Sequence, residues 1–144
     1  MSDYNPSIVS HVSLGSRNLA AAAAFYDAVL ACIGARRQQE ITLPDQGLVA
    51  VAYGKQFPEF WIQLPDDRQT ATVGNGVHVG FIADDKQSVH DFYDKAIQHG
   101  GCDNGAPGPR PHYGEAYYGC FVFDPDGNKI EATFWDNSLA TPSG

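Results

Sequence analysis

The chain has 144 residues, of which 43% are hydrophobic, and this length favours one compact domain over residues 1–144 rather than two independent ones. The formal net charge is −8 and Arg36-Arg37 is the only adjacent basic pair, which argues against nucleic acid or an anionic membrane as a partner. The apolar run at 19–25 is too short to span a bilayer, and the N-terminus lacks the pattern of a secretory signal. We therefore expect a cytoplasmic protein.

The first half of the chain predicts a strand, a helix and three further strands. Residues 8–14 are rich in β-branched side chains, as strands are. Apolar side chains then recur with the period of a helix, and Gly34 follows as a stop signal. These helical positions are Leu19, Ala22, Ala23, Tyr26 and Leu30. Segments of strand character follow at 36–42, 48–53 and 59–64.

The second half predicts the same order of elements after a connector at residues 70–76. A strand at 77–82 leads into a helix that Asp84 or Asp85 can cap. Its apolar positions are Val89, Phe92, Tyr93, Ala96 and Ile97. Further strands are predicted at 102–105, 117–123 and 129–134. The sequence Asp-Pro-Asp-Gly-Asn at 124–128 favours a tight turn, because proline presets one dihedral angle and glycine accepts a positive φ.

The two halves match each other without a gap when the second is shifted by 67 residues. His11-Val12 matches His78-Val79, Phe25-Tyr26-Asp27 matches Phe92-Tyr93-Asp94, and Gly34 matches Gly101. A repeat of this kind predicts two copies of one supersecondary unit. We therefore predict an α+β fold built from two βαβββ modules, residues 8–64 and 77–134.

The repeat places His11 and His78 at equivalent points of equivalent strands. Near the end of each module an oxygen donor interrupts an apolar strand, Gln63 in the first and Glu131 in the second. A buried carboxylate needs a charged partner or a metal, and no Lys or Arg is obviously placed beside Glu131. Two imidazoles with oxygen donors and no thiolate suit one divalent ion, which is Zn, Ni, Co, Mn or Fe(II). Taken singly, each residue also fits a plainer reading as a hydrogen-bonded or solvated side chain.

These residues resemble the vicinal-oxygen-chelate superfamily, which includes glyoxalase I, bleomycin-resistance proteins, fosfomycin-resistance enzymes and extradiol dioxygenases. The motifs that carry the resemblance are His11-Val12 with residues 25–30, residues 76–79, and residues 124–131. The resemblance implies a curved mixed sheet or half-barrel around a metal or ligand cavity. It also implies metal ligands at His11, His78 and Glu131. Gln63 stands where bacterial glyoxalase I has a second glutamate, so its role as a ligand stays open.

The resemblance implies a metal-dependent, glyoxalase-like lyase or isomerase acting on a small vicinally oxygenated substrate, with a thiol adduct as one candidate. Glu131 is the ligand that can move a proton in such a reaction. Two alternatives stay open, a metal-free ligand-binding protein like the bleomycin-resistance members and an Fe(II) dioxygenase-like enzyme. A homodimer is expected because many relatives dimerise. Whether the site lies within one chain or between two, and whether glutathione or another thiol is used, stays open.

The segment before the last hairpin is crowded with polar aromatic side chains and a guanidinium, and is expected to form one wall of the substrate pocket. The predicted substrate-binding residues are Arg110, His112, Tyr113 and Tyr118. Arg110 can hold an anionic group with two hydrogen bonds, and the others can donate hydrogen bonds or relay a proton. The plainer reading is surface charge and packing. Trp61 is expected on the side of its strand opposite to Gln63, in the core or in a dimer interface rather than in contact with a ligand.

Overall fold

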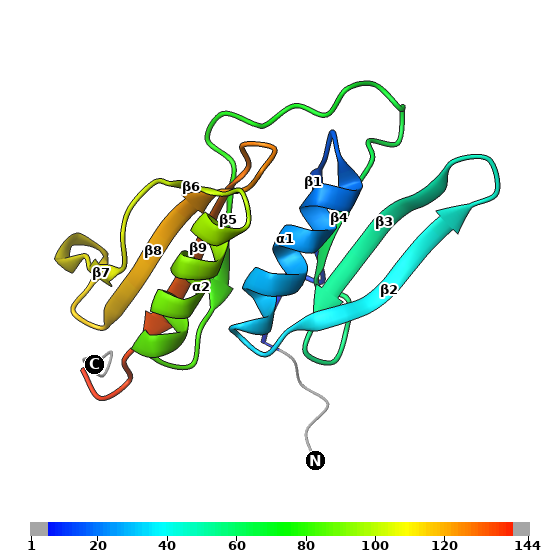
Figure 1. The fold of residues 1–144 in the computed structure, drawn as a ribbon. Helices are drawn as coiled ribbons and strands as arrows, with labels where there is room; N and C mark the ends of the chain where they lie inside the picture. The colour runs from blue at the N-terminus through cyan, green and yellow to red at the C-terminus, as the bar shows by residue number, and fades with distance from the viewer. Residues whose placement is uncertain (1–5, 140–144) are drawn as a thin grey trace, which may run out of the picture.

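The computed structural model describes residues 6–139, which form two helices and two separate mixed sheets (Figure 1). The elements of the first half are β1 (Val12–Gly15), α1 (Leu19–Ala31), β2 (Arg36–Leu43), β3 (Gly47–Gly54) and β4 (Phe60–Gln63). Those of the second half are β5 (His78–Ile82), α2 (Lys86–Gln98), β6 (Cys102–Asp103), β7 (Gly108–Pro109), a 3₁₀ helix η1 (Pro111–Tyr113), β8 (Tyr117–Phe123) and β9 (Lys129–Trp135). The predicted α+β fold of two βαβββ modules is confirmed.

The two sheets have equivalent strand orders, β1-β4-β3-β2 and β5-β9-β8-β6, with the short β7 also pairing with β8. In each sheet the first strand is parallel to the last, and the remaining pairs are antiparallel. This order leaves β1 and β5 as edge strands of their sheets. The connector at 64–77 arches over the same end of the molecule as the hairpin at 124–128 (Figure 1).

The first strand is shorter than predicted. Residues 8–11 are not strand, and β1 begins at Val12, whose N–H donates to the carbonyl of Glu59. Its partner β4 begins only at Phe60, just after Pro58, so residues further towards the N-terminus have no strand to pair with. His11 therefore lies just outside β1, whereas its counterpart His78 lies inside β5 and is paired with Lys129.

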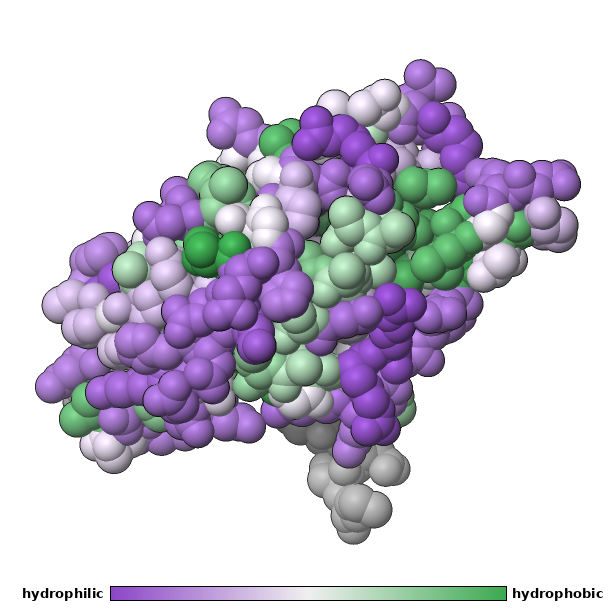
Figure 2. Space-filling model, viewed as in Figure 1, coloured by the Kyte–Doolittle hydropathy of each residue, from purple (hydrophilic) through white to green (hydrophobic). Residues whose placement is uncertain are grey.

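Each helix covers its own sheet and touches the other helix, so the core lies between the helices and the sheets (Figure 1). Asn18 caps α1 and Asp85 caps α2, each side chain accepting a backbone N–H of the first turn. The outward side of α1 is largely alanine, which gives the hydrophobic band in Figure 2 beside the hydrophilic α2. The rings of Phe60 and Phe81 meet edge to face at 5.1 Å and join the two modules. Neither helix is long and apolar enough to cross a membrane.

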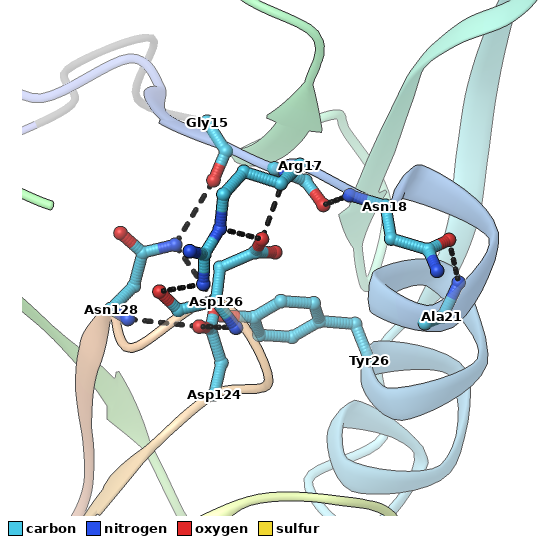
Figure 3. Close-up of polar contacts among 9 residues, drawn as sticks. Gly15, Arg17, Asn18, Ala21, Tyr26, Asp124, Asp126 and Asn128 are labelled. Atoms are coloured by element: carbon cyan, nitrogen blue, oxygen red, sulfur yellow. Dashed lines mark hydrogen bonds and ion pairs between the residues drawn. The ribbon is translucent and has the colours of Figure 1, made fainter. Parts of the chain in front are cut away.

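A buried polar cluster around Asp124 ties the last hairpin to the first module (Figure 3). The hydroxyl of Tyr26 in α1 donates to Asp124 Oδ2 at 2.7 Å, and the backbone N–H groups of Asp126 and Asn128 donate to Oδ1 at 2.9 Å. The amide of Asn128 donates to Asp124 Oδ2 at 3.0 Å and to the carbonyl of Gly15 in β1 at 3.1 Å. Burial raises the pKa of the Asp124 carboxyl, and the hydrogen-bond donors oppose that rise. The cluster thus fixes the end of β1 against the start of β9.

Replacing Tyr26 by Phe tests this cluster, because the substitution removes one donor from a buried carboxylate and leaves the ring packing unchanged. We expect Tyr26→Phe to lower the free energy of unfolding by about 1.5–3 kcal/mol, measured by urea denaturation. Tyr93→Phe is the matched control, since its hydroxyl donates to Asp103 in an exposed hydrogen bond and its loss should cost no more than about 0.5 kcal/mol. Equal losses in the two variants would contradict this role.

Candidate functional site

The second module carries a group of polar side chains on the face of its sheet turned away from α2. Strand pairing places Phe121 of β8, Glu131 of β9 and Gly80 of β5 in one row across the sheet. His78 is two residues before Gly80, and side chains alternate along a strand, so it lies on the same face. Glu131 is 9% exposed, which makes it the least exposed carboxylate on this face. The row is therefore the centre of the candidate site.

Each oxygen of the Glu131 carboxylate has a different partner. The hydroxyl of Tyr117 donates to Oε2 at 2.5 Å, while Nε2 of His78 lies 3.3 Å from Oε1. Burial of Tyr117 and its hydrogen bond to Glu131 raise the pKa of the phenol above its ordinary value. The phenol is therefore the hydrogen-bond donor, and the Glu131 carboxyl accepts the bond. Glu131 Oε1 and His78 Nε2 therefore lie next to each other, as two atoms that can coordinate a metal ion.

Two glycines make room for this arrangement. A Cβ at Gly119 would lie 2.5 Å from the Tyr117 hydroxyl and 2.7 Å from the carbonyl of Ala132, so only glycine lets the phenol lie along the strand. A Cβ at Gly80 would lie 3.4 Å from Glu131 Oε1, so glycine also keeps this oxygen accessible beside His78. The local sequence thus provides a slot that fits the carboxylate and its two partners.

Two cations lie on the same face without pairing with Glu131. The guanidinium of Arg110 and the ammonium of Lys129 lie 5.3 and 4.8 Å from the centre of the Phe121 ring. Within residues 6–139, neither forms an ion pair with Glu131. Arg110 donates to the carbonyls of Ala106, Gly108 and Gly119, so it fastens its own loop to β8.

The structure separates the predicted substrate-binding residues. The ring of Tyr113 lies 5.1 Å from that of Tyr117, and the His112 ring lies 4.2 Å from that of Tyr113 and is tilted against it, so both lie on the Glu131 side with Arg110. Tyr118 points the other way, towards α2, where its hydroxyl lies 2.6 Å from Nε2 of His90. The alternation of side chains along β8 explains why Tyr117 and Tyr118 face opposite sides. The turn at 124–128 pairs Glu131 with Phe121, and Tyr117, four residues before Phe121, lies on the same face. That signal was present in the sequence and identifies Tyr117, which we had not predicted.

The first module holds the other predicted ligands. His11 is exposed, with Nδ1 2.9 Å from the Ser10 hydroxyl, and shares with Trp61 the lining of a hollow of about 800 Å³. Ser13 pairs with Trp61 as Gly80 pairs with Glu131, so Trp61 occupies the place that mirrors Glu131. Gln63 lies two residue pairs further along β4, on the same face as Trp61. The expectation that Trp61 lies opposite to Gln63 and packs in the core is therefore wrong, and its place in a dimer interface stays a prediction.

The predicted metal ligands do not come together within residues 6–139 of one chain. No three His, Cys, Asp or Glu side chains among these residues lie close enough together to hold a metal ion. His78 and Glu131 are adjacent, whereas His11 precedes β1 and Gln63 lies in β4 of the other sheet. A largely apolar hollow of about 460 Å³, lined by residues of β4 and β5 among others, lies between the modules. A complete three-ligand set therefore requires the first module to meet the second in another way.

Comparison with known proteins places this geometry in a family. A model described as the Glyoxalase/Bleomycin resistance protein/Dioxygenase superfamily matches residues 8–132. The crystal structure of a glyoxalase/bleomycin resistance protein from Albidiferax ferrireducens T118 is 32% identical, with a TM-score of 0.75 over 89% of this chain and 98% of that one. A glyoxalase-related enzyme from Fulvimarina pelagi is 20% identical, with a TM-score of 0.64 over 88% and 86% of the two chains. No curated protein matches the chain.

The glycine at position 119 offers a test of the slot around Tyr117. Gly119→Ala should lower the free energy of unfolding by about 1–3 kcal/mol, because the added methyl overlaps the phenol and a backbone carbonyl. Gly108 is its partner across the β7–β8 pair and has nothing within 4 Å of an added Cβ. Gly108→Ala should be neutral or stabilise by up to about 1 kcal/mol in thermal unfolding. An unaffected Gly119→Ala variant would contradict the packing described.

Proposed function

Because the chain belongs to the glyoxalase/bleomycin resistance protein/dioxygenase superfamily, we propose that it is a metal-dependent, glyoxalase-type lyase or isomerase. Its substrate on this proposal is a small molecule with two neighbouring oxygens. The observation that carries the proposal is the pair formed by Glu131 Oε1 and His78 Nε2, which lie 3.3 Å apart, with the glutamate only 9% exposed. A buried carboxylate without a cationic partner is costly, and a divalent ion would remove that cost.

The donor atoms fit such an ion. His78 and Glu131 of the second module would hold it with His11 of a first module, and imidazole with carboxylate suits Zn, Ni, Co, Mn or Fe(II). When bound, the ion supplies a Lewis acid that polarises two neighbouring substrate oxygens. Trp61, and not Gln63, takes the place in the first module that mirrors Glu131. Gln63 would therefore be at most a secondary ligand.

The side chains around Glu131 suit proton transfer on a bound substrate. With Oε2 held by Tyr117, Oε1 of Glu131 would be the atom that takes a proton from a substrate carbon and returns it to the neighbouring carbon, whenever Oε1 is not itself bound to the ion. Tyr113 lies beside Tyr117 and His112 beside Tyr113, and both would line the substrate. Arg110 lies over Phe121 and donates to backbone carbonyls of its own loop and of β8, so it would attract an anionic group while holding that wall in place.

A second copy of the chain would complete the site. β1 and β5 are both edge strands, and apolar side chains are exposed on or beside them. These side chains are Ile8, Val9, Val77 and Ile82, which are between 53% and 98% exposed. Edge strands with apolar side chains are favourable surfaces for association. We propose a homodimer in which the first module of one protomer faces the second module of its partner.

The runner-up function is a metal-free protein that binds a planar compound, as bleomycin-resistance relatives do. The half-exposed rings of Tyr113 and Trp135 favour it, because both pack edge to face on Tyr117 and leave a surface for stacking. The pairing of His78 with Glu131 has no role in such binding, which is why the enzyme is the first proposal.

Metal content separates the two functions. We expect about one ion per chain after reconstitution with each candidate metal, because the ligand set belongs to one site per chain, and His78→Ala should lose it. Inductively coupled plasma mass spectrometry after gel filtration is the measurement. His90→Ala is the control, since His90 lies on α2 and bonds Tyr118 on the other face of the sheet. A wild-type protein that retains none of the five metals would overturn the enzyme proposal.

Mixing two inactive variants tests whether the site is shared between chains. Each site of a His11→Ala or His78→Ala homodimer lacks one ligand, but a mixed dimer regains one intact site. With free exchange of subunits, the mixture should recover about a quarter of the wild-type metal content, because half of the dimers are mixed. His78→Ala mixed with Glu131→Ala should recover none, since both changes lie in the second module. Recovery in neither mixture, with metal bound by the wild type, would place the whole site within one chain.

A further inference from the structure

We propose that Tyr117 is a positioning residue that fixes the Glu131 carboxylate so that only one of its oxygens, Oε1, is presented to a metal ion beside His78. This inference rests on the proposed metal site and adds to it a residue outside the ligand set. We infer that Glu131 binds the ion through a single oxygen and that the Tyr117 side chain determines which oxygen this is.

The contacts of the two carboxylate oxygens carry the proposal. Oε2 accepts the Tyr117 hydroxyl at 2.5 Å, at the short end of hydrogen bonds between a hydroxyl and a carboxylate. Oε1 faces Gly80, where no Cβ intervenes, and lies 3.3 Å from His78 Nε2. A metal ion that bound both oxygens would compete with the phenol for Oε2. Oε2 is thus held by the Tyr117 hydroxyl, whereas Oε1 faces the His78 imidazole, beside which an ion would bind.

The phenol is itself held in place. Tyr117 is only 3% exposed, and its ring packs edge to face against Tyr113 at 5.1 Å and Trp135 at 5.3 Å. Below the ring, Gly119 leaves the space that the hydroxyl occupies. A side chain restrained by two rings and a backbone surface has few alternative rotamers, so it orients Glu131 at little further entropic cost. Residues that orient a ligand in this way contribute strongly to metal affinity.

The neighbouring residue provides a matched control. Tyr118 has the same side chain one position along β8, but its hydroxyl lies 2.6 Å from His90 on the face covered by α2. Replacing either tyrosine by Phe removes one hydroxyl and one hydrogen bond. Only the change at Tyr117 alters the environment of Glu131, so a general loss of stability is separable from loss of positioning.

The test is Co(II) binding by the intact protein, followed by its visible absorption. Tyr117→Phe should weaken Co(II) binding about 10–100-fold, which is the usual effect of removing a residue that orients a metal ligand. The absorption should also weaken per bound ion, because the freed Oε2 can join and a higher coordination number lowers the intensity of Co(II) bands. Tyr118→Phe should match the wild type in affinity and spectrum.

A second measurement needs no change at Tyr117. Infrared difference spectra of the wild type with and without Co(II), assigned by their loss in Glu131→Gln, report whether one or two carboxylate oxygens bind the ion. We expect the wide separation of the two carboxylate stretches that a single bound oxygen produces. A narrow separation in the wild type, or a folded Tyr117→Phe variant with wild-type affinity and spectrum, would overturn the positioning role alone. A wild type that binds no Co(II) under conditions where the other candidate metals also fail would overturn the metal site and this inference together.

Discussion

The constraint on which the site depends is the burial of the Glu131 carboxylate in an apolar sheet. A carboxylate in such surroundings is costly unless hydrogen bonds and a positive charge compensate it. Tyr117 and His78 provide two contacts, and Gly119 leaves the space that the phenol needs. A bound divalent ion would supply the positive charge, which is why the proposed chemistry is centred on Glu131.

Two groups of contacts hold the modules together. The Asp124 cluster and the Phe60–Phe81 contact tie the modules together at the hairpin end and through the core. They leave the β1 and β5 edges unpaired with each other. A monomer built this way presents half of a ligand set on each sheet. The proposed dimer follows from that division, because it joins His11 of one chain to His78 and Glu131 of the other without changing either module.

The sequence predicted the repeat, both helices, the turn at 124–128 and the family, all of which are confirmed. It offered Asp84 or Asp85 as the cap of α2, and the structure has Asp85 there. These features can be recognised from local periodicity and from residue types that are characteristic of particular turns and helix caps. The details of the site depend on strand register, which local patterns do not determine. Gln63 was matched to Glu131 by counting residues, whereas pairing with β1 puts Trp61 in that place. Tyr117 was predictable from alternation once the hairpin was recognised, and the neighbouring Tyr118 was chosen instead.

The central claim is that Glu131 and His78 form the second-module half of a metal site that a first module completes. The most direct measurement is a crystal structure of the Co(II)-loaded protein with anomalous diffraction collected at the cobalt edge. We predict one strong anomalous peak beside Glu131 Oε1 and His78 Nε2, with the imidazole of His11 from a second protomer as the third ligand. A peak at other residues, or diffraction from loaded crystals without a peak at Glu131, would contradict it.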